Sequence, residues 1–360
     1  MTEKIVKPLL KWYDENARIL PWREEPTPYR VWVSEIMLQQ TRVEAVKPFF
    51  ERFVKNLPDI TELAECEPER LLKLWEGLGY YNRVKNMQKA AIVVKEQYGG
   101  KLPDDYERLM SLPGIGSYTA GAIASIAYGI AVPAVDGNVL RVITRVTADS
   151  DDIMKQSVRR KVEDELGRII PKERPGAFNQ ALMELGATVC VPNGMAKCEQ
   201  CPLAKFCTAH IQGREMDFPS KKKKKERKIE EKTVLVIRDG ERAAIRKRPT
   251  KGLLAGMYEL PNLAGHLSED EVLREMKEMN FSPIRIQKLG VAKHIFSHVE
   301  WHMIGYVVWV EESEDMPDQM ILVEPEETEK TYPIPAAFTA YARYLNIRLG
   351  QEKYEKNEKE

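Results

Sequence analysis

Two acidic residues stand where acid chemistry could occur, and Glu35 is the first of them. It lies in the stretch YRVWVSEIMLQQTRVEAV, which reads as a helix crowded with apolar side chains. A carboxyl group in such a setting tends towards a raised pKa, which suits a general acid near neutral pH. The alternative is a glutamate on the polar surface of the helix. Gln40 and Thr41 follow as uncharged hydrogen-bonding side chains that suit reading base edges or filling a gap in a duplex.

The second acid is Asp136, which precedes Gly137 and Asn138 at a predicted helix start in PAVDGNVLRVITR. An aspartate here has an ordinary explanation as an N-cap, which stabilises a helix by about 1 kcal/mol. From these residues alone the N-cap is the favoured interpretation.

A glycine-containing turn lies between two predicted helices, in LPGIGSYTAGAIASIA over residues 112–127. Gly114 and Gly116 permit backbone angles and close approaches that other residues would block. The exposed amides at the start of the second helix could then bind a phosphate. A plain turn between packed helices explains the pattern equally well.

Four of the five cysteines fall within eighteen residues, CVPNGMAKCEQCPLAKFC, and seven, two and five residues separate them. The N-terminal segment predicts an amphipathic helix and not a signal peptide, so we expect a reducing cytoplasm and metal ligands before disulfides. Zinc sites usually show two close pairs, and here only one pair is close. The spacing therefore favours a [4Fe–4S] cluster over zinc and leaves both open. The lone Cys66 is expected to serve packing. The candidate ligands are Cys190, Cys198, Cys201 and Cys207.

The length of 360 residues predicts two domains, and 43% hydrophobic with 31% charged residues is an ordinary soluble composition. No run of eighteen apolar residues exists, so no membrane span is expected. The net charge is zero, but residues 311–329 carry nine carboxylates and no basic residue. The remainder is therefore +9, which leaves room for a basic face elsewhere.

Hydrophobic spacing predicts three regions. Residues 1–207 have helical periodicity. Residues 208–231, with five consecutive lysines at 221–225, predict an exposed basic linker, a solvated tether that could also lie along phosphates. Residues 232–360 predict an α+β domain, with a hairpin around Asp239-Gly240, a helix over 269–281, a strand over 299–311 and a closing helix over 335–347.

Taken together, the motifs resemble the MutY-type adenine DNA glycosylases of the helix–hairpin–helix, iron–sulfur superfamily. The resemblance covers residues 5–207 through LPWR, SEIMLQQTRV, WEGLGYYNR, LPGIGSYTA, DGNV and NQALMELGA. It continues more weakly through RKRPTKGLLAGMYELP and HIFSHVEWHM. It implies a mainly α helix–hairpin–helix DNA glycosylase fold with a [4Fe–4S] loop, plus a C-terminal α+β NUDIX-like domain.

The resemblance implies removal of adenine opposite 8-oxoguanine, or more weakly opposite G, from double-stranded DNA. Adenine would be flipped into a pocket and its N-glycosidic bond hydrolysed. Glu35 would protonate adenine and later help to activate water, and Asp136 would stabilise or capture the oxocarbenium ion. Asn138 would orient Asp136, and Tyr118 would pack beside both acids. The endonuclease III branch carries a lysine where this chain has Tyr118, so a monofunctional enzyme is expected.

The resemblance also assigns binding residues. Gln40, Thr41 and Leu78 would lodge at the lesion, and Tyr80 would be a wedge beside 8-oxoguanine. The amides of Gly114 and Gly116 would grip the DNA backbone, and the four clustered cysteines would hold the [4Fe–4S] cluster. We expect a monomer in a bacterial cytoplasm. The residues for the adenine pocket are Trp22, Arg23 and Gln180, and those for 8-oxoguanine are Phe296, Ser297 and His298.

The candidate helix SEDEVLREMKEMNF of the C-terminal domain lacks the glutamate-rich sequence with which NUDIX enzymes hold magnesium. This domain is therefore expected to bind 8-oxoguanine and not to hydrolyse a substrate. Two positions depart from the family. The first cysteine gap is seven residues where six is usual, and Leu140 stands where some members carry lysine. Three alternatives are an endonuclease III-type glycosylase/lyase, a non-catalytic DNA-binding or metal-sensing module, and a NUDIX pyrophosphatase. Tyr118, the Glu35–Asp136 pair and the missing glutamate-rich helix argue against them in turn.

Overall fold

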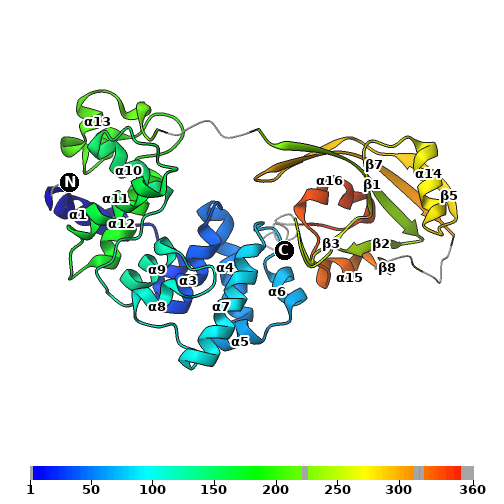
Figure 1. The fold of residues 1–360 in the computed structure, drawn as a ribbon, viewed down its shortest axis with the longest axis horizontal. Helices are drawn as coiled ribbons and strands as arrows, with labels where there is room; N and C mark the ends of the chain where they lie inside the picture. Colours follow the sequence, from blue (N-terminus) through cyan, green and yellow to red (C-terminus); the bar gives the residue numbers. More distant parts are fainter. Residues whose placement is uncertain (1–2, 221–225, 312–315, 317–319, 350–360) are drawn as a thin grey trace. The chain divides into compact units, whose positions relative to one another are not determined.

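The computed structural model describes residues 3–220, 226–311, 316 and 320–349, which form two compact units (Figure 1). The helical unit takes its residues from 1–65 and 85–224, and the sheet unit from 66–84 and 225–360. In the part of the chain that is described, no helix is both long and apolar enough to cross a membrane.

The helical unit is built of helices joined by short turns, as the periodicity predicts, and its end returns to pack beside its beginning (Figure 1). α9 continues into a π-helical stretch, Ile123–Ala127. α7 starts in the sheet unit and runs on into the helical unit. The helices are α1 Val6–Asn16, α2 Pro21–Glu24, α3 Pro28–Leu38, α4 Val43–Asn56, α5 Ile60–Glu65, α7 Asn82–Tyr98, α8 Tyr106–Met110, α9 Ser117–Ala122, α10 Gly137–Thr147, α11 Gln156–Gly167, α12 Pro175–Thr188 and α13 Thr208–Ile211.

Helix α10 lies at the centre of one core of this unit. Its apolar residues recur at i, i+3, i+4 and i+7, so one stripe faces inward. The stripe packs against α12 and α13. Burying each such side chain stabilises the fold by roughly 1.5–3 kcal/mol. The packing thereby fixes the start of α10, where Asp136 stands. The buried residues of the stripe are Val139, Val142, Ile143 and Val146.

The sheet unit is a mixed sheet in which the long strands β1 and β7 run parallel and the other pairs are antiparallel. The central order is β3-β2-β1-β7-β5, with β4, β6 and β8 paired to β1, β7 and β2. The hairpin predicted around Asp239-Gly240 joins β1 and β2. The strands are β1 Lys228–Asp239, β2 Arg242–Lys247, β3 Tyr258–Glu259, β4 Asn262–Ala264, β5 Pro283–Lys288, β6 Ala292–Ile295, β7 Val299–Val310 and β8 Met320–Val323.

Both faces of this sheet are covered. Val234 and Val236 of β1 belong to one core and Leu235 and Ile237 to another, as the two-residue period of a strand requires. Helix α14, Glu269–Glu278, contributes to the second core, and residues 334–349 contribute to the first (Figure 1). The predicted closing helix is present as three short turns, η6 Ala336–Phe338, α16 Thr339–Ala342 and η7 Arg343–Leu345.

The predicted basic linker over 208–231 is shorter in the structure. Residues 208–211 form α13, Ala209 and Phe218 are buried in the core of the helical unit, and β1 begins at Lys228. Two apolar side chains in a polar stretch gave too weak a signal to predict this packing. The lysines at 221–225 lie outside the described residues.

The helical region also differs in one segment from the predicted domain over 1–207. Residues 66–84, with helix α6 Pro68–Leu74, belong to the compact unit of the sheet. The contacts that hold this segment join it to residues more than 170 positions later in the chain. Local periodicity carries no information about such contacts.

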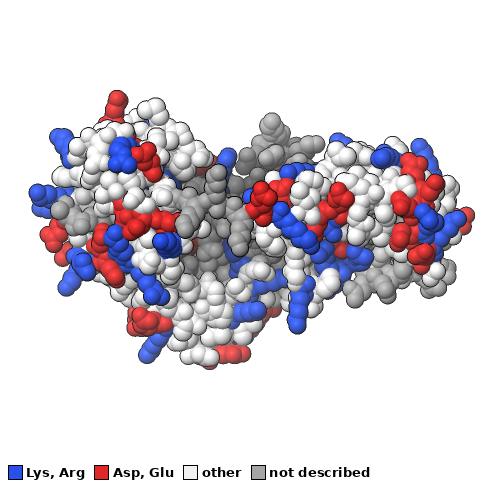
Figure 2. Space-filling view, turned by 45° about the horizontal axis from the view of Figure 1, so that its top comes forward, with Lys and Arg blue, Asp and Glu red and all other residues white. Residues whose placement is uncertain are grey.

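Charge on the surface is mixed. On the face drawn in Figure 2, Lys and Arg are interspersed with Asp and Glu on both units. The basic field that the charge count leaves room for is not a feature of this face.

Gly121 on α9 allows the closest approach in this unit. A β-carbon on Gly121 would lie 2.3 Å from the carbonyl oxygen of Pro133. We predict that Gly121→Ala destabilises the helical unit by about 3 kcal/mol, because the obstructing atom is backbone. Gly167→Ala is the matched control, since Gly167 is also helical, as the last residue of α11, but has open space around it. Thermal unfolding followed by circular dichroism should show a lower melting temperature for Gly121→Ala alone; equal effects would contradict the prediction.

Candidate active site

Helix α3 carries Glu35 into the interior of the helical unit. The helix begins after Thr27, whose side chain accepts a hydrogen bond of 3.3 Å from the backbone N–H of Arg30. Its residues from Val31 to Met37 are all buried, which is typical of a helix that is apolar on every side. Glu35 is 6% exposed. This excludes the alternative of a surface glutamate.

Tyr118 donates a hydrogen bond to Oε2 of Glu35. Burial raises the pKa of Glu35 to about 7, against an opposing effect of the Tyr118 bond. The charge of Asp136 raises this pKa further and that of Arg23 lowers it. Glu35 can therefore hold a proton near neutral pH and release it there. The sequence prediction of a raised pKa at this residue is confirmed.

Asp136 is the N-cap of α10, and it is also part of this site. Its Oδ1 accepts the backbone N–H of Val139 at 2.7 Å, and its Oδ2 accepts Nδ2 of Asn138 at 2.8 Å. Burial raises the pKa of Asp136, and these bonds oppose the rise. Burial, with the charges of Glu35 and Asp136, keeps the pKa of Tyr118 well above its ordinary value, so its phenol stays a donor. The two acids and Tyr118 thus form one electrostatic group.

Asn179 of α12 supports the segment that leads into Asp136. Its side chain is fully buried and makes three hydrogen bonds. Its oxygen accepts the N–H of Ala134 at 3.0 Å, and its nitrogen donates to the carbonyl of Val132 at 2.9 Å and to Oγ of Ser125 at 2.8 Å. A buried amide with every bond satisfied holds a single geometry. This side chain thereby fixes the backbone two residues before Asp136.

A chain of hydrogen bonds joins Asp136 to the cysteine segment. Asn138, which donates to Asp136, accepts Nη2 of Arg141 at 2.8 Å. Nε of Arg141 donates to the carbonyl of Cys190 and Nη2 to the carbonyl of Gly186, both at 2.8 Å. The guanidinium is buried, so each donor that is not bonded would cost free energy. The position of Asp136 is therefore tied to the folding of the cysteine segment.

Two arginines and a buried glutamate form a charged group close to Glu35. Nε and Nη2 of Arg18 bond to Glu184 at 2.5 and 3.2 Å, and Nη2 of Arg23 bonds to it at 2.7 Å. Burial opposes ionisation, but the Arg18 bond and the Arg23 charge lower the pKa of Glu184. Trp22 packs edge-on against Phe50, with ring centroids 5.4 Å apart. The positive charge of Arg23 lowers the pKa of Glu35.

The predicted hairpin joins α8 and α9. Gly114 has φ of +76°, and a β-carbon there would lie 2.7 Å from Cβ of Asn86, so glycine is required. Gly116 has ordinary extended angles at the N-cap of α9 and open space around it. Only one of the two glycines therefore needs its conformational freedom. The other leaves the amides at the start of α9 accessible.

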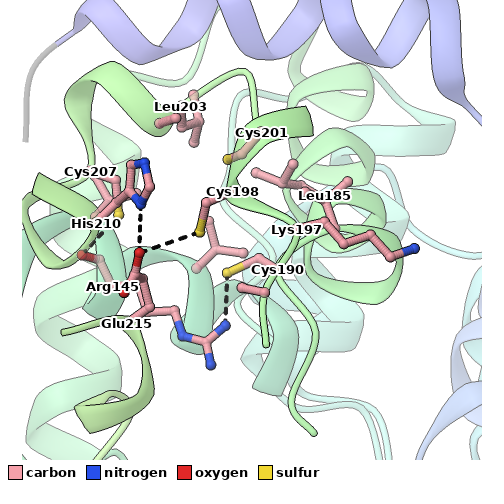
Figure 3. A pocket seen from close by; sticks show the side chains of 15 residues that line it. Arg145, Leu185, Cys190, Lys197, Cys198, Cys201, Leu203, Cys207, His210 and Glu215 are labelled. Carbon is pink, nitrogen blue, oxygen red and sulfur yellow. Dashed lines mark hydrogen bonds and ion pairs between the residues drawn. The ribbon is translucent and has the colours of Figure 1, made fainter. Parts of the chain in front are cut away.

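The four clustered cysteines line one pocket together with Arg145, His210 and Glu215 (Figure 3). Nη1 of Arg145 lies 3.2 Å from Sγ of Cys190. Burial raises the pKa of the thiols of Cys198 and Cys201 to about 11 and about 12, and the charges of the neighbouring cysteines add to this. Thiols in this arrangement become thiolates when a cation binds them. The donor set therefore fits a thiolate-bound metal group.

Two of the remaining predicted residues of the helical unit, Gln40 and Thr41, follow α3, and the third, Gln180, lies within α12. Gln40 follows α3, is exposed and has φ of +60°, and Thr41 beside it is half-buried. Gln180 is half-buried on α12, three residues before Met183, whose sulfur is 3.9 Å from the Tyr118 hydroxyl. Their contacts with a substrate stay predictions.

The predicted binding residues of the sheet unit lie in two loops. Leu78 is buried and Tyr80 is 47% exposed with φ of +48°. Phe296, Ser297 and His298 turn between β6 and β7, with Ser297 and His298 exposed. These residues belong to a different unit from Glu35 and Asp136.

Sequence reasoning missed Glu184, Arg141 and Asn179. Each is a polar residue on an otherwise apolar helix, and each is buried. A polar residue at a core position of a predicted helix is the signal that could have identified them, because a buried polar group must be bonded.

Two family models match the chain. The model of HhH-GPD superfamily base excision DNA repair proteins matches residues 33–168, and that of the NUDIX domain matches residues 233–344. A thermostable thymine-DNA glycosylase structure is 27% identical, with a TM-score of 0.53 over 58% of this chain and 97% of its own. An endonuclease III–DNA complex is 25% identical, with a TM-score of 0.51 over 59% and 98%. The fold and site define a helix–hairpin–helix DNA N-glycosylase of base excision repair with a C-terminal NUDIX domain.

The curated relatives narrow this class. Adenine DNA glycosylase of Rattus norvegicus is 35% identical over 81% of this chain and 68% of its own length. That of Buchnera aphidicola subsp. Acyrthosiphon pisum is 35% identical over 84% and 86%. The human one is 34% identical over 81% and 64%. The chain belongs to the adenine DNA glycosylase family.

The buried carboxyl of Glu35 makes stability depend on pH. Its pKa is raised from 4.5 to about 7, so the folded state binds more protons than the unfolded state in this range. Stability is lost as pH rises through this window, by about 3 kcal/mol for this group. We predict that the free energy of unfolding of Glu35→Gln, relative to that of the wild type, increases as the pH rises from 5 to 8. Urea unfolding of both proteins at several pH values measures this free energy. A difference between the two proteins that does not change with pH would contradict the prediction.

Proposed function

We propose that this protein removes adenine paired with 8-oxoguanine, and more weakly adenine paired with G, from double-stranded DNA. The observation that carries the proposal is a buried Glu35 with a pKa near neutrality, beside Asp136 and Tyr118. Loss of a base needs an acid for the leaving group and a carboxylate facing the developing positive charge of the sugar. These residues supply both. The adenine DNA glycosylases that resemble the chain support adenine as the base.

The reaction balances with these groups alone. Glu35 gives its proton to the flipped adenine, and the electron pair of the C1′–N bond leaves with the base. Asp136, whose ionised form is favoured by the hydrogen bonds from Asn138 and the N–H of Val139, faces the oxocarbenium ion. Water then adds to C1′ and returns its proton to Glu35. The pocket for the base would be walled by Trp22, Arg23 and Gln180, with the buried Glu184 holding Arg23 in place.

We propose that the enzyme does not cleave the strand. Strand cleavage through a Schiff base needs an amine beside the sugar. Within the described residues, the principal charged neighbours that shift the pKa of Glu35 are Asp136 and Arg23, and the one that shifts the pKa of Asp136 is Arg141, so no lysine is among them. Tyr118 stands where a lysine would act, and a phenol cannot form a Schiff base.

We propose that the sheet unit binds the opposite strand and does not hydrolyse nucleotides. Glu271 of α14 is engaged in a capping box with Ser268. In the described part of this unit, no three acidic, histidine or cysteine ligand atoms converge as a metal site would need. Leu78 and Tyr80, with Phe296, Ser297 and His298, would contact the 8-oxoguanine strand.

We predict alkali-dependent breaks only in the adenine strand of duplexes carrying A opposite 8-oxoguanine. A thymine glycol duplex should stay intact, and breaks without alkali would contradict the monofunctional assignment. Glu35→Gln and Asp136→Asn should each lower single-turnover excision by at least about 10²-fold, the range of acid–base catalysis, with DNA binding retained. Glu44→Gln is the control, because its side chain is exposed on α4. Loss of binding in either acid variant would mean that the residue is structural.

We propose that the cysteines hold a [4Fe–4S] cluster, which shapes the loop and takes no part in bond cleavage. The loop with Lys197 and Lys205 would face phosphates.

We predict a brown protein with broad visible absorption and about four irons and four sulfides per chain. Cys198→Ser should lose this iron, whereas Cys66→Ala should keep it, because Cys66 lies in the sheet unit. A colourless protein with one zinc would overturn the assignment.

A further inference from the structure

The segment that carries Leu78 and Tyr80 is fastened to the sheet unit by two buried charged residues. Lys73 at the end of α6 and Glu76 just after it form an ion pair of 2.9 Å. Their side chains are 11% and 1% exposed. Neither residue has a role in the function proposed above. Both point to one stretch of the C-terminal domain, residues 328–334.

Lys73 makes two hydrogen bonds and one ion pair at one place. Nζ donates to the carbonyl oxygens of Tyr332 at 2.7 Å and Thr328 at 3.2 Å, and it pairs with Glu76. Thr328 lies in the last turn of α15, Pro325–Lys330, whose final carbonyls lack partners within the helix. A cation at a helix C-terminus is favourable. Oε2 of Glu76 accepts no hydrogen bond within the described residues, so its contact with the ammonium is the attraction of opposite charges. The side chain of Lys73 therefore caps the C-terminal end of α15.

Glu76 grips the next part of the same stretch. Its Oε1 accepts the backbone N–H of Ile334 at 3.0 Å, and Ile334 is fully buried. A second ion pair joins Glu69 of α6 to Lys247 of β2, but both of its side chains are more than 40% exposed. Exposed pairs contribute little, whereas removing one partner of a buried pair leaves an uncompensated charge. The attachment therefore depends on Lys73 and Glu76.

The loop after Glu76 is held rigidly to this anchor. Nε1 of Trp75 donates to the carbonyl of Gly79 at 3.0 Å. The guanidinium of Arg83 donates to the carbonyls of Leu78 and Gly79 and lies over the rings of Trp75 and Tyr80. Tyr80 itself has a left-handed backbone, which the surrounding bonds must maintain. A shift of Glu76 would therefore move the Tyr80 ring.

The other recognition loop is supported by Phe338, which follows this stretch in the chain. Phe296 packs on Trp301 with ring centroids 4.8 Å apart, and Trp301 packs on Phe338 at 6.0 Å. Phe338 is fully buried four residues after Ile334. The carbonyl of Pro333 accepts the N–H of Tyr258, which ties the stretch to β3. Residues 328–338 therefore lie between the two loops and contact the supports of both.

We propose that Lys73 and Glu76 are positioning residues for the choice of the opposite base, because they fix the Tyr80 loop and the 296–298 loop in one register. This inference rests on the proposed recognition of 8-oxoguanine by the two loops. Excision from A opposite 8-oxoguanine then needs both loops in place on one base. Excision from A opposite G, which lacks the 8-oxo group, depends less on the register.

The test compares Lys73→Met and Glu76→Gln with the wild type in single-turnover excision from both duplexes. The expected result is a loss of about tenfold in the rate preference for A opposite 8-oxoguanine, within the range of coupling between sites. The A opposite G rate should stay within about twofold, as expected for a change confined to the coupling. Lys330→Met is the matched control, because Lys330 is a lysine of an exposed ion pair on α15 itself.

The outcomes separate this inference from the proposed function. A wild type without any preference for 8-oxoguanine overturns the proposed function. A wild type with the preference, and variants that keep it, overturn the positioning role. A merely structural role would lower both rates together with the melting temperature. If Lys73→Met does not fold, Glu76→Gln carries the test, because it removes the charge that pairs with Lys73 while its side-chain oxygen can still accept the N–H of Ile334.

A double-variant cycle gives the second readout. Ser297→Ala should reduce the preference in the wild-type background and reduce it less when Glu76→Gln is already present, because the loop has then lost its register. Additive losses would show that the two loops act independently and would overturn the proposal.

Discussion

The hydrogen bond from Tyr118 to the buried carboxyl of Glu35 is the contact on which the helical unit depends. Burial gives Glu35 a pKa of about 7 and would be costly without a donor at that carboxyl. The donor comes from α9, so α3 and α9 must pack closely, and Gly121 lets α9 also approach the segment before Asp136. The buried carboxyl of Glu35 thus requires α3, α9 and the segment before Asp136 to lie close together.

The two acids differ because their surroundings differ. Glu35 lies among apolar side chains and accepts a hydrogen bond from one hydroxyl group. Asp136, at the start of a helix, accepts hydrogen bonds from a side-chain amide and from a backbone N–H. Such a difference separates acid from carboxylate roles. Arg141 links Asn138, the partner of Asp136, to the backbone of Cys190 through hydrogen bonds. A group bound by the cysteines would therefore influence the site through folding and needs no part in the chemistry.

In the function proposed above, the sheet unit serves recognition of the opposite strand and not hydrolysis. Its sheet is covered on both faces and its acidic helix is occupied with capping itself. Its two loops with exposed side chains, around Tyr80 and Ser297, rest on residues 328–338. One of these loops belongs to the chain segment between α5 and α7, so the boundary between units does not follow the boundary between sequence families.

Features determined by neighbours in sequence were predictable: the helices of the first region, the hairpin of β1 and β2, the cap at Asp136, the left-handed Gly114 and the four cysteines. The apolar surroundings of Glu35 predicted its pKa, but only the packed structure excluded a surface position. Tertiary structure alone decided that Arg18 meets Glu184, 166 residues away, that Phe218 packs back on the core, and that residues 66–84 join the sheet. Periodicity reports which face of an element is apolar, whereas the partner of that face is selected by contacts between distant parts of the chain.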